Sequence, residues 1–311
     1  MSANGTIARR VGRTGVVLLV VYAITFVCVR LTPGNPFAAR APRALSPDQQ
    51  ARLERQFGLD DPWPVQFVRY LFRALSGDFG VSYAHQGEDV VDVIVARAWP
   101  TMSLVGAALL VGLVVGVPLG VAAALRNDSW FDHLLSGVGT LGVAIPVFVA
   151  TPVLVIVLSV YAGWLPAQGW DGLISTTAII PIVVLALEPI AVTARFTRAS
   201  MIEVLRSDHH RTARARGLAR RTVVFRFALR NGLVPVTTIT GLQVAGLLGS
   251  VVLVESAYNV PGLGKEFLAA ITARDYPVVM AATLIFAAVI VVANLLVDVA
   301  YARLDPRIRS A

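Results

Sequence analysis

The sequence predicts an all-α membrane protein with six transmembrane helices. Hydrophobic residues make up 56% of the 311 residues, the mean hydropathy is +0.70, and only 15% of the residues are charged. A soluble domain carries about 25% charged residues, so much of this surface must face lipid. The composition excludes a disordered, collagen-like or coiled-coil chain, and the single Cys28 excludes a disulfide framework within one chain.

Each predicted span is an apolar run long enough to cross a hydrocarbon core of about 30 Å, which needs about 20 helical residues. The six runs are Gly15–Leu31, Thr101–Leu125, Leu134–Leu165, Ile174–Thr193, Leu233–Val254 and Val278–Tyr301. The third run exceeds one crossing and contains Pro146 and Pro152, which predicts a tilt or a kink. The fourth contains Pro181 and Pro189, so it is expected inside a bundle or beside a cavity, where neighbours satisfy the freed backbone.

The loop charges predict the orientation, because Lys and Arg accumulate on the cytoplasmic side of a membrane. With the N-terminus inside, 17 basic residues fall in cytoplasmic segments and 3 in the short outer segments. Both termini are therefore expected in the cytoplasm, in a multi-pass plasma (inner) membrane protein. Arg9, Arg10 and Arg13 before the first run also fit a secretory signal, whose cleavage would leave five spans; we favour an uncleaved anchor.

The outer segment Thr32–Trp99, here called the cap, is too long for a turn and is expected to fold. Ser46 followed by Pro47 predicts a helix start, with Leu53 and Phe57 on one face of that helix. A second helix is expected over Val65–Leu75. The aromatic residues around it suit either an interfacial position or packing within the cap: Trp63, Phe67, Tyr70 and Phe72. The resulting division is 1–100 for anchor helix and cap, and 101–311 for a five-helix core.

The cytoplasmic segment 195–232 is strongly basic, with ten arginines against Glu203 and Asp208. One interpretation is a surface that holds anionic lipid headgroups. Nucleic acid is not expected as a partner, because the segment is tethered to the bilayer. Asp208 is expected to begin a short helix that Gly217 ends in a left-handed conformation, and Arg220–Arg230 is expected to form another.

Small residues suggest a more specific role for this segment. Ala213, Ala215 and Gly217 leave the short helix with little bulk, so that another protein's surface can approach its backbone closely.

Motifs along the chain resemble a known family. The motifs are T-A-R-A-R-G-L at Thr212–Leu218, R-F-A-L-R-N-G-L-V-P at Arg226–Pro235, L-T-P-G-N-P at Leu31–Pro36, G-D-F-G-V-S at Gly77–Ser82, P-G-L-G at Pro261–Gly264 and R-D-Y-P at Arg274–Pro277. In this order and spacing, the chain resembles the permeases of ABC importers, and more narrowly the B-type subunit of the oligopeptide and dipeptide group. It departs from the general importer signature, because Arg211 and Thr212 replace Glu and Ala. The stretch Gly217–Pro235 is also longer than that signature, and the peptide group shares this length.

The resemblance implies a type I ABC importer permease fold, in which this chain and a second homologous permease form the path for di- and oligopeptides. It implies a coupling helix near Asp208–Gly217 that docks in a groove of an ATPase subunit. The residues expected in that coupling loop are Asp208, Thr212, Ala213, Ala215, Gly217 and Leu218. One or two partner ATPases would bind ATP and Mg²⁺, this chain would hold no cofactor, and an extracytoplasmic solute-binding protein would deliver the solute.

Two alternatives stay open from the sequence. One is a permease of the same family for nickel, glutathione or an oligosaccharide, and the more remote one is an ATP-independent secondary transporter. An enzyme is not expected. Gly264–Lys265 lacks the rest of a phosphate-binding loop, and the histidines lack the spacing of a helical metal site and are expected on surfaces or loops: His85, His133, His209 and His210.

Glu188 and Asp298 lie within predicted spans, where carboxylates are costly and often line ion or substrate routes. The sequence favours a structural role for each. Asp298 is expected to pair with an arginine such as Arg303, and Glu188 is expected to be buried against a neighbouring span near its proline.

Overall fold

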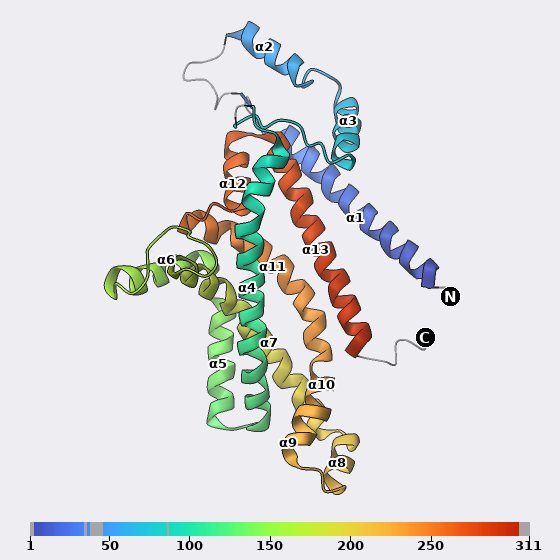
Figure 1. Ribbon diagram of the computed structural model, residues 1–311, viewed down its shortest axis with the longest axis vertical. Helices are drawn as coiled ribbons and strands as arrows, with labels where there is room; N and C mark the ends of the chain where they lie inside the picture. Colours follow the sequence, from blue (N-terminus) through green and yellow to red (C-terminus); the bar gives the residue numbers. More distant parts are fainter. Residues whose placement is uncertain (1–2, 34–35, 38–45, 86, 305–311) are drawn as a thin grey trace. The chain divides into compact units, whose positions relative to one another are not determined.

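The computed structural model describes residues 3–33, 36–37, 46–85 and 87–304 (Figure 1). Within these ranges the regular elements are helices, apart from one isolated bridge between Val81 and Asp89. Among the described residues, five helices are long and apolar enough to cross a membrane, and a bent pair of helices makes a sixth span when the pair is counted as one crossing. The prediction of an all-α chain with six spans is thereby confirmed.

The helices follow the predicted runs closely, with most boundaries shifted by a few residues. In chain order they are α1 (Ala3–Leu31), α2 (Pro47–Gln56), α3 (Trp63–Leu75), α4 (Val90–Leu125), α5 (Trp130–Ala144), α6 (Val147–Val155), α7 (Ile179–Arg206), α8 (Asp208–Ala215), α9 (Arg220–Thr222), α10 (Leu229–Gly232), α11 (Val234–Tyr258), α12 (Leu263–Ala273) and α13 (Tyr276–Leu304). Two π-helical stretches add to these, Ile156–Tyr161 after α6 and Val223–Ala228 between α9 and α10.

The chain divides into two compact units. The first comprises the residues up to Trp99 together with Pro261–Val291, and the second comprises Pro100–Val260 together with the residues from Val292 onward. The first division therefore falls close to residue 100, where the sequence also divides the chain. The stretch 261–291, which the sequence grouped with the core, packs instead with the first unit.

In the first unit, the cap begins as its sequence indicates. The Ser46 hydroxyl accepts a hydrogen bond from the Gln49 backbone N–H at 3.3 Å, and the Gln49 side chain accepts one from the Ser46 N–H at 3.0 Å. This reciprocal pair caps α2 in front of Pro47. Leu53 and Phe57 both pack on the apolar core of the unit, which confirms that they share one face.

The aromatic residues of α3 divide between the two predicted roles. Phe67 and Tyr70 pack in a cluster with Tyr22 of α1, whose hydroxyl donates to the Phe67 carbonyl at 2.8 Å. Trp63 and Phe72 are instead 49% and 68% exposed. Phe67 and Tyr70 therefore pack inside the first unit, whereas Trp63 and Phe72 lie on its surface.

Polar contacts join distant motifs of the first unit. The Ser82 hydroxyl and the Ala84 N–H both donate to one carboxylate oxygen of the buried Asp275. Nearby, the Glu266 carboxylate lies 2.8 Å from His85 Nε2 and 2.7 Å from Arg97 Nε. Two motifs nearly 200 positions apart in sequence, G-D-F-G-V-S and R-D-Y-P, thus meet through a hydroxyl and a carboxylate.

In the second unit, the predicted third span is broken rather than tilted. Figure 1 shows α5 and α6 meeting at a sharp turn, and the two helices are bent by 101° at Ile145–Pro146. Pro146 has no N–H to donate, and Ile145 adopts extended backbone with ψ 114°, so the helix stops and a new one starts. In a kinked helix all residues stay helical. Here Ile145 and Pro146 lie outside both helices.

A seam of glycines joins α4 to α7 in the same unit. Gly112, Gly116 and Gly120 recur every fourth residue and therefore lie on one face of α4. A Cβ atom at Gly116 would lie 2.8 Å from the Ile190 carbonyl oxygen, and one at Gly120 would lie 2.5 Å from that of Ala194. Neither position has room for a side chain, so the two backbones approach as closely as helices in lipid do.

Candidate coupling segment and intramembrane carboxylates

The short helix predicted at Asp208 is present as α8, and its coupling role stays a prediction. The helix α7 ends at Arg206, Ser207 adopts extended backbone with ψ 153°, and α8 begins at Asp208 in a new direction. The Thr212 hydroxyl donates to the Asp208 carbonyl at 2.9 Å inside the helix. Gly217 has φ +76°, which confirms the left-handed terminator. The first residues of the predicted segment, 195–206, belong to α7 instead.

Small residues are among the exposed residues of this segment. Asp208, Thr212, Ala215 and Gly217 are exposed, and Ala213 is half-buried. A Cβ atom at Gly217 would meet nothing within 4 Å, so the space beside it is open. Five of the six predicted coupling residues therefore lie at the surface, since Leu218 is 41% exposed as well: Asp208, Thr212, Ala215, Gly217 and Leu218.

The support beneath α8 is a small, closely packed core. Met201 of α7 is fully buried among Val121 and Ala124 of α4 and Val224 and Ala228 of the π-helical stretch. α8 itself packs against the end of α7 and against that stretch. The short helix is therefore held on a base that includes both α4 and α7.

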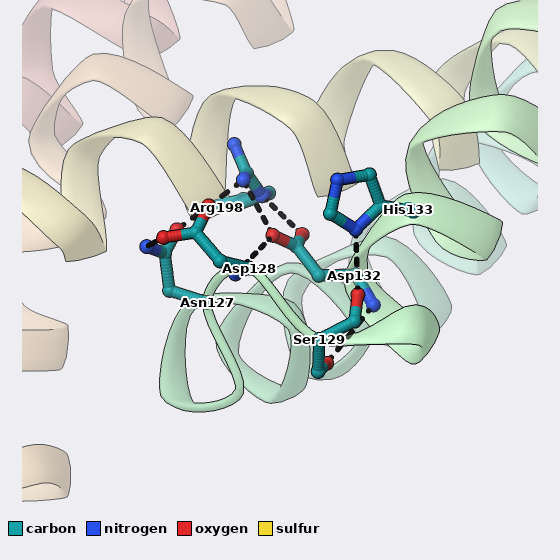
Figure 2. A network of polar contacts seen from close by, with 6 residues as sticks. All are labelled: Asn127, Asp128, Ser129, Asp132, His133 and Arg198. Carbon is teal, nitrogen blue, oxygen red and sulfur yellow. Dashed lines mark hydrogen bonds and ion pairs between the residues drawn. The ribbon is translucent and has the colours of Figure 1, made fainter.

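An ion pair ties α5 to α7 a short distance along α7 from this base (Figure 2). The Arg198 guanidinium donates from Nε and Nη2 to the two carboxylate oxygens of Asp132, and the Nη2 to Oδ2 distance is 2.6 Å. Asp132 is only 2% exposed, whereas the Arg198 side chain is 30% exposed. A two-pronged contact of this kind fixes both the distance and the angle between its helices.

The loop before α5 completes the network of Figure 2. The Asp128 N–H donates to Asp132 at 3.1 Å, and Arg198 Nη2 donates to the Asn127 side-chain oxygen at 3.3 Å. Ser129 caps α5 by accepting from the Asp132 N–H at 3.3 Å. Arg198 lies eight residues before the end of α7, about 12 Å along the helix. The network therefore fixes the α4–α5 loop to the part of α7 that leads into α8.

One of the two predicted intramembrane carboxylates, Glu188, differs from expectation. Glu188 is exposed in this chain, so the expectation that it is buried against a neighbouring span is wrong. It lines a cavity beside the break between α5 and α6. Asp298 lies in α13, but its side chain and that of Arg303 fall outside the described part of the structure, so their expected pairing stays a prediction.

A third intramembrane carboxylate was missed because α11 extends beyond the predicted span end at Val254. Glu255 is fully buried within α11, and the Thr101 hydroxyl donates to its carboxylate at 2.6 Å. The signal for it was weak, since Glu255 followed directly on an apolar run.

The two histidines whose side chains are described, His85 and His133, take part in polar contacts. His85 pairs with Glu266, and His133 Nδ1 lies 2.8 Å from the Ser129 carbonyl oxygen. Among the described residues, no group of three or more His, Cys, Asp or Glu side chains is arranged to hold a metal ion.

Comparison with known proteins decides the family. Residues 116–310 match the model of the binding-protein-dependent transport system inner membrane component. Residues 5–105 match the model of the N-terminal part of such membrane components. The chain belongs to this family. Its resemblance to ABC importer permeases is thereby confirmed.

Curated relatives match this family member over nearly its full length. The oligopeptide transport system permease protein OppB of Salmonella typhimurium is 39% identical over 292 residues, which cover 94% of this chain and 95% of that protein. The dipeptide transport system permease protein DppB of Lactococcus lactis subsp. cremoris is 37% identical over 303 residues, covering 97% and 98% respectively.

Solved structures show the fold. A chain of the inward-facing MetNI methionine ABC transporter is similar with a TM-score of 0.53 at 18% identity, covering 68% of this chain and 94% of that one. An amino acid ABC transporter matches with a TM-score of 0.54 at 14% identity and the same coverage. The permease has the type I ABC importer fold.

Sequence reasoning found α8 but missed the residues that support it. Asp132 and Arg198 lie 66 positions apart, and each by itself resembles an ordinary charged residue near a loop. The glycine seam did leave a signal, the four-residue spacing of small residues in an apolar run, which is typical of close helix packing in membranes.

Proposed function

We propose that this chain is the permease subunit of an ATP-driven peptide importer and forms half of its translocation path. The observation that carries the proposal is α8: a short helix with small exposed residues, packed against the end of a spanning helix and against the π-helical stretch, both of which share the buried core around Met201. Such an element transmits a push from a docked partner because it cannot bend independently of its base. Ala215 and Gly217 leave that partner's surface free to approach.

The peptide substrate is proposed from relatives. The proteins named for oligopeptide and dipeptide transport are 37–39% identical to this chain over nearly its whole length. The transported solute is accordingly a di- or oligopeptide, moved inward. ATP and Mg²⁺ bind to separate ATPase subunits in this proposal, and a second homologous permease completes the path.

The orientation follows from the charges. With α8 and both termini in the cytoplasm, basic residues are enriched on the inner side, as the positive-inside rule requires. The cap then lies outside, where a solute-binding protein delivers the peptide. The cap carries a cleft of about 670 Å³ whose walls include Arg55, Arg69, Asp61 and Asp78, and this polar surface suits a transient protein contact.

Reconstitution tests the function directly. The chain, its partner permease, the ATPases and the binding protein are placed in proteoliposomes, and uptake of a labelled tripeptide is followed with and without ATP. Accumulation is expected only when the ATPases and ATP are present. Uphill uptake by this chain alone would refute the assignment, and ATP-driven uptake of nickel, glutathione or an oligosaccharide in place of peptide would refute the substrate.

Substitutions in α8 test the coupling surface. Ala215→Arg adds bulk to an exposed helical position, so insertion and assembly are expected to persist while ATP hydrolysis stimulated by the loaded binding protein is lost. Gly217→Arg is expected to have the same effect, but its φ of +76° also strains any other residue. Gly217→Asn, which tolerates that conformation, and Ala215→Ser serve as controls and should keep most of the stimulation. Normal stimulation of the Ala215→Arg complex would contradict the docking role.

A further inference from the structure

Glu188 occupies an unusual position in the second unit. It lies nine residues after the start of α7, about 14 Å along the helix, which is close to the middle of a 30 Å hydrocarbon core. The next residue, Pro189, packs against α4, because a Cβ atom at Gly112 would come within 2.4 Å of the Pro189 Cβ. Successive residues are rotated by about 100° around a helix, so Glu188 points away from that contact.

The Glu188 side chain borders a cavity of about 220 Å³ beside the sharp turn between α5 and α6. The walls are apolar apart from Glu188 and Ser250, with Pro146 at the turn and Val184 one helical turn earlier on α7. Because α5 and α6 separate at Pro146, the break provides the space that Glu188 faces.

The carboxylate has no cationic or hydrogen-bonding partner among the described side chains, and it is exposed. Glu255 of α11 differs from Glu188 in both respects, because it is buried and accepts a hydrogen bond from Thr101 of the same unit. A charged side chain at the centre of a bilayer costs about 2.5–3.5 kcal/mol or more when it faces lipid. Glu188 therefore requires water or a cation on its exposed side.

We propose that Glu188 is a substrate-binding carboxylate in the translocation path, and that the group it binds is a primary ammonium of the transported peptide. The inference rests on the proposed peptide importer and adds the chemical group that is recognised inside the membrane. The lysine side chain of a transported peptide carries such an ammonium, and its opposite charge matches the single carboxylate. The apolar walls of the cavity accept the uncharged remainder, and Ser250 offers a hydroxyl beside it.

A selectivity measurement tests the ligand. In the full reconstituted transporter, uptake of a lysine-containing tripeptide is compared with uptake of a matched glutamate-containing one. Glu188→Gln is expected to lower the lysine-to-glutamate uptake ratio about tenfold, equivalent to about 1.4 kcal/mol, while ATP hydrolysis stimulated by the binding protein stays within about twofold. Glu188→Asp, which keeps the charge, is expected to retain most of the ratio. A purely structural role would change folding or hydrolysis and leave the ratio as it was.

Accessibility gives an independent measurement. Cys28 is the single cysteine of the chain, so a Cys28→Ser background allows one thiol to be placed at a chosen position. In the assembled transporter, Glu188→Cys is expected to react with a membrane-impermeant thiosulfonate, and a saturating tripeptide is expected to slow that reaction. Val183→Cys is the matched control, because Val183 is also exposed on α7 but lies outside the cavity.

Several results would overturn the inference. An unchanged uptake ratio in Glu188→Gln does so, as does labelling of Glu188→Cys no faster than Val183→Cys. Loss of the second permease from the purified Glu188→Gln complex also does so, because a partner subunit's cation would then be the occupant. If the unmodified transporter accumulates no peptide, the proposed function itself fails; if it does and the ratio is unchanged, only the role of Glu188 fails.

Discussion

The two units of this permease are stabilised by different kinds of contact. The first unit has an aromatic core, in which the rings of Phe57 and Tyr83 lie 4.8 Å apart, and its loops are tied by side-chain hydrogen bonds such as Ser82 to Asp275. The second unit has the glycine seam, where α4 and α7 meet through their backbones. In lipid, burying apolar side chains between helices gains little, so close packing of small residues replaces the aromatic core.

The same contrast appears in two aspartate–arginine pairs. Asp132 is 2% exposed and accepts two hydrogen bonds from Arg198 in the second unit. The side chains of Arg73 and Asp78 in the cap are 47% and 55% exposed, although their geometry is also two-pronged. Burial rather than geometry is the difference, so the first pair should matter much more to stability.

The largest effect is expected at the glycine seam. Gly120→Leu forces a side chain against the Ala194 carbonyl oxygen and the Arg198 N–H, which are backbone atoms and cannot rotate away. Overpacking of this kind costs about 1–3 kcal/mol and more where backbone must move. Gly106→Leu on the same helix is the control, since a Cβ atom there meets nothing within 4 Å. Thermal unfolding in detergent measures the stability of both variants. Equal unfolding midpoints would show that the glycine seam does not contribute to stability.

The next effect is expected at the buried ion pair. Asp132→Ala leaves Arg198 without its carboxylate, and a lost hydrogen bond to a charged group costs about 1.5–3 kcal/mol. The same substitution should weaken the coupling between ATP hydrolysis and uptake, because the start of α5 is then no longer tied to the part of α7 that leads into α8. The exchanged pair Asp132→Arg with Arg198→Asp is expected to recover part of the stability. A double-mutant cycle without any coupling energy would show that the contact contributes nothing.

The smallest effect is expected at the exposed pair of the cap. Hydrogen bonds from the Arg73 side chain and then from the Gly80 N–H lower the pKa of Asp78 below its ordinary value of 3.8. The pair therefore stabilises the folded cap at pH above about 4, and the contribution is lost as the pH falls through the lowered pKa. Asp78→Asn should cost less than about 1 kcal/mol at neutral pH. Limited proteolysis of the cap between pH 3 and 7 measures this loss of stability, with Asp60→Asn as the control. A loss of stability in Asp78→Asn larger than that in Asp132→Ala would contradict the expected order of the two pairs.

Much of the secondary structure was predictable because it depends on local chemistry. Ser46 and Pro47 predicted the start of α2, and Gly217 predicted the end of the α8 segment, since capping and positive φ are decided within a few residues. The sequence predicted the position of the break at Pro146 but only a tilt or a kink there, whereas the two helices are bent by 101°. A proline disrupts a helix locally, whereas the angle of the resulting bend depends on what the two halves pack against.

The candidate site was predictable only in part. The proposed coupling residues stand together in sequence, from Asp208 to Leu218, so one motif was enough to suggest them. Glu188 was recognised as unusual, but its predicted burial was wrong, because exposure depends on where α5 and α6 separate. The length of α11 likewise placed Glu255 inside a span, where it accepts a hydrogen bond from Thr101.

The sequence by itself determined that this chain is an all-helical membrane protein of the ABC importer permease type, with a short helix that begins near Asp208. Those features depend on composition, on hydrophobic runs and on short motifs, each of which is read within one segment. Only the tertiary structure decided which residues support that helix and which carboxylate faces a cavity. Arg198 meets Asp132 across 66 positions, and Gly120 meets Ala194 across 74, because those contacts depend on how helices pack rather than on any local preference.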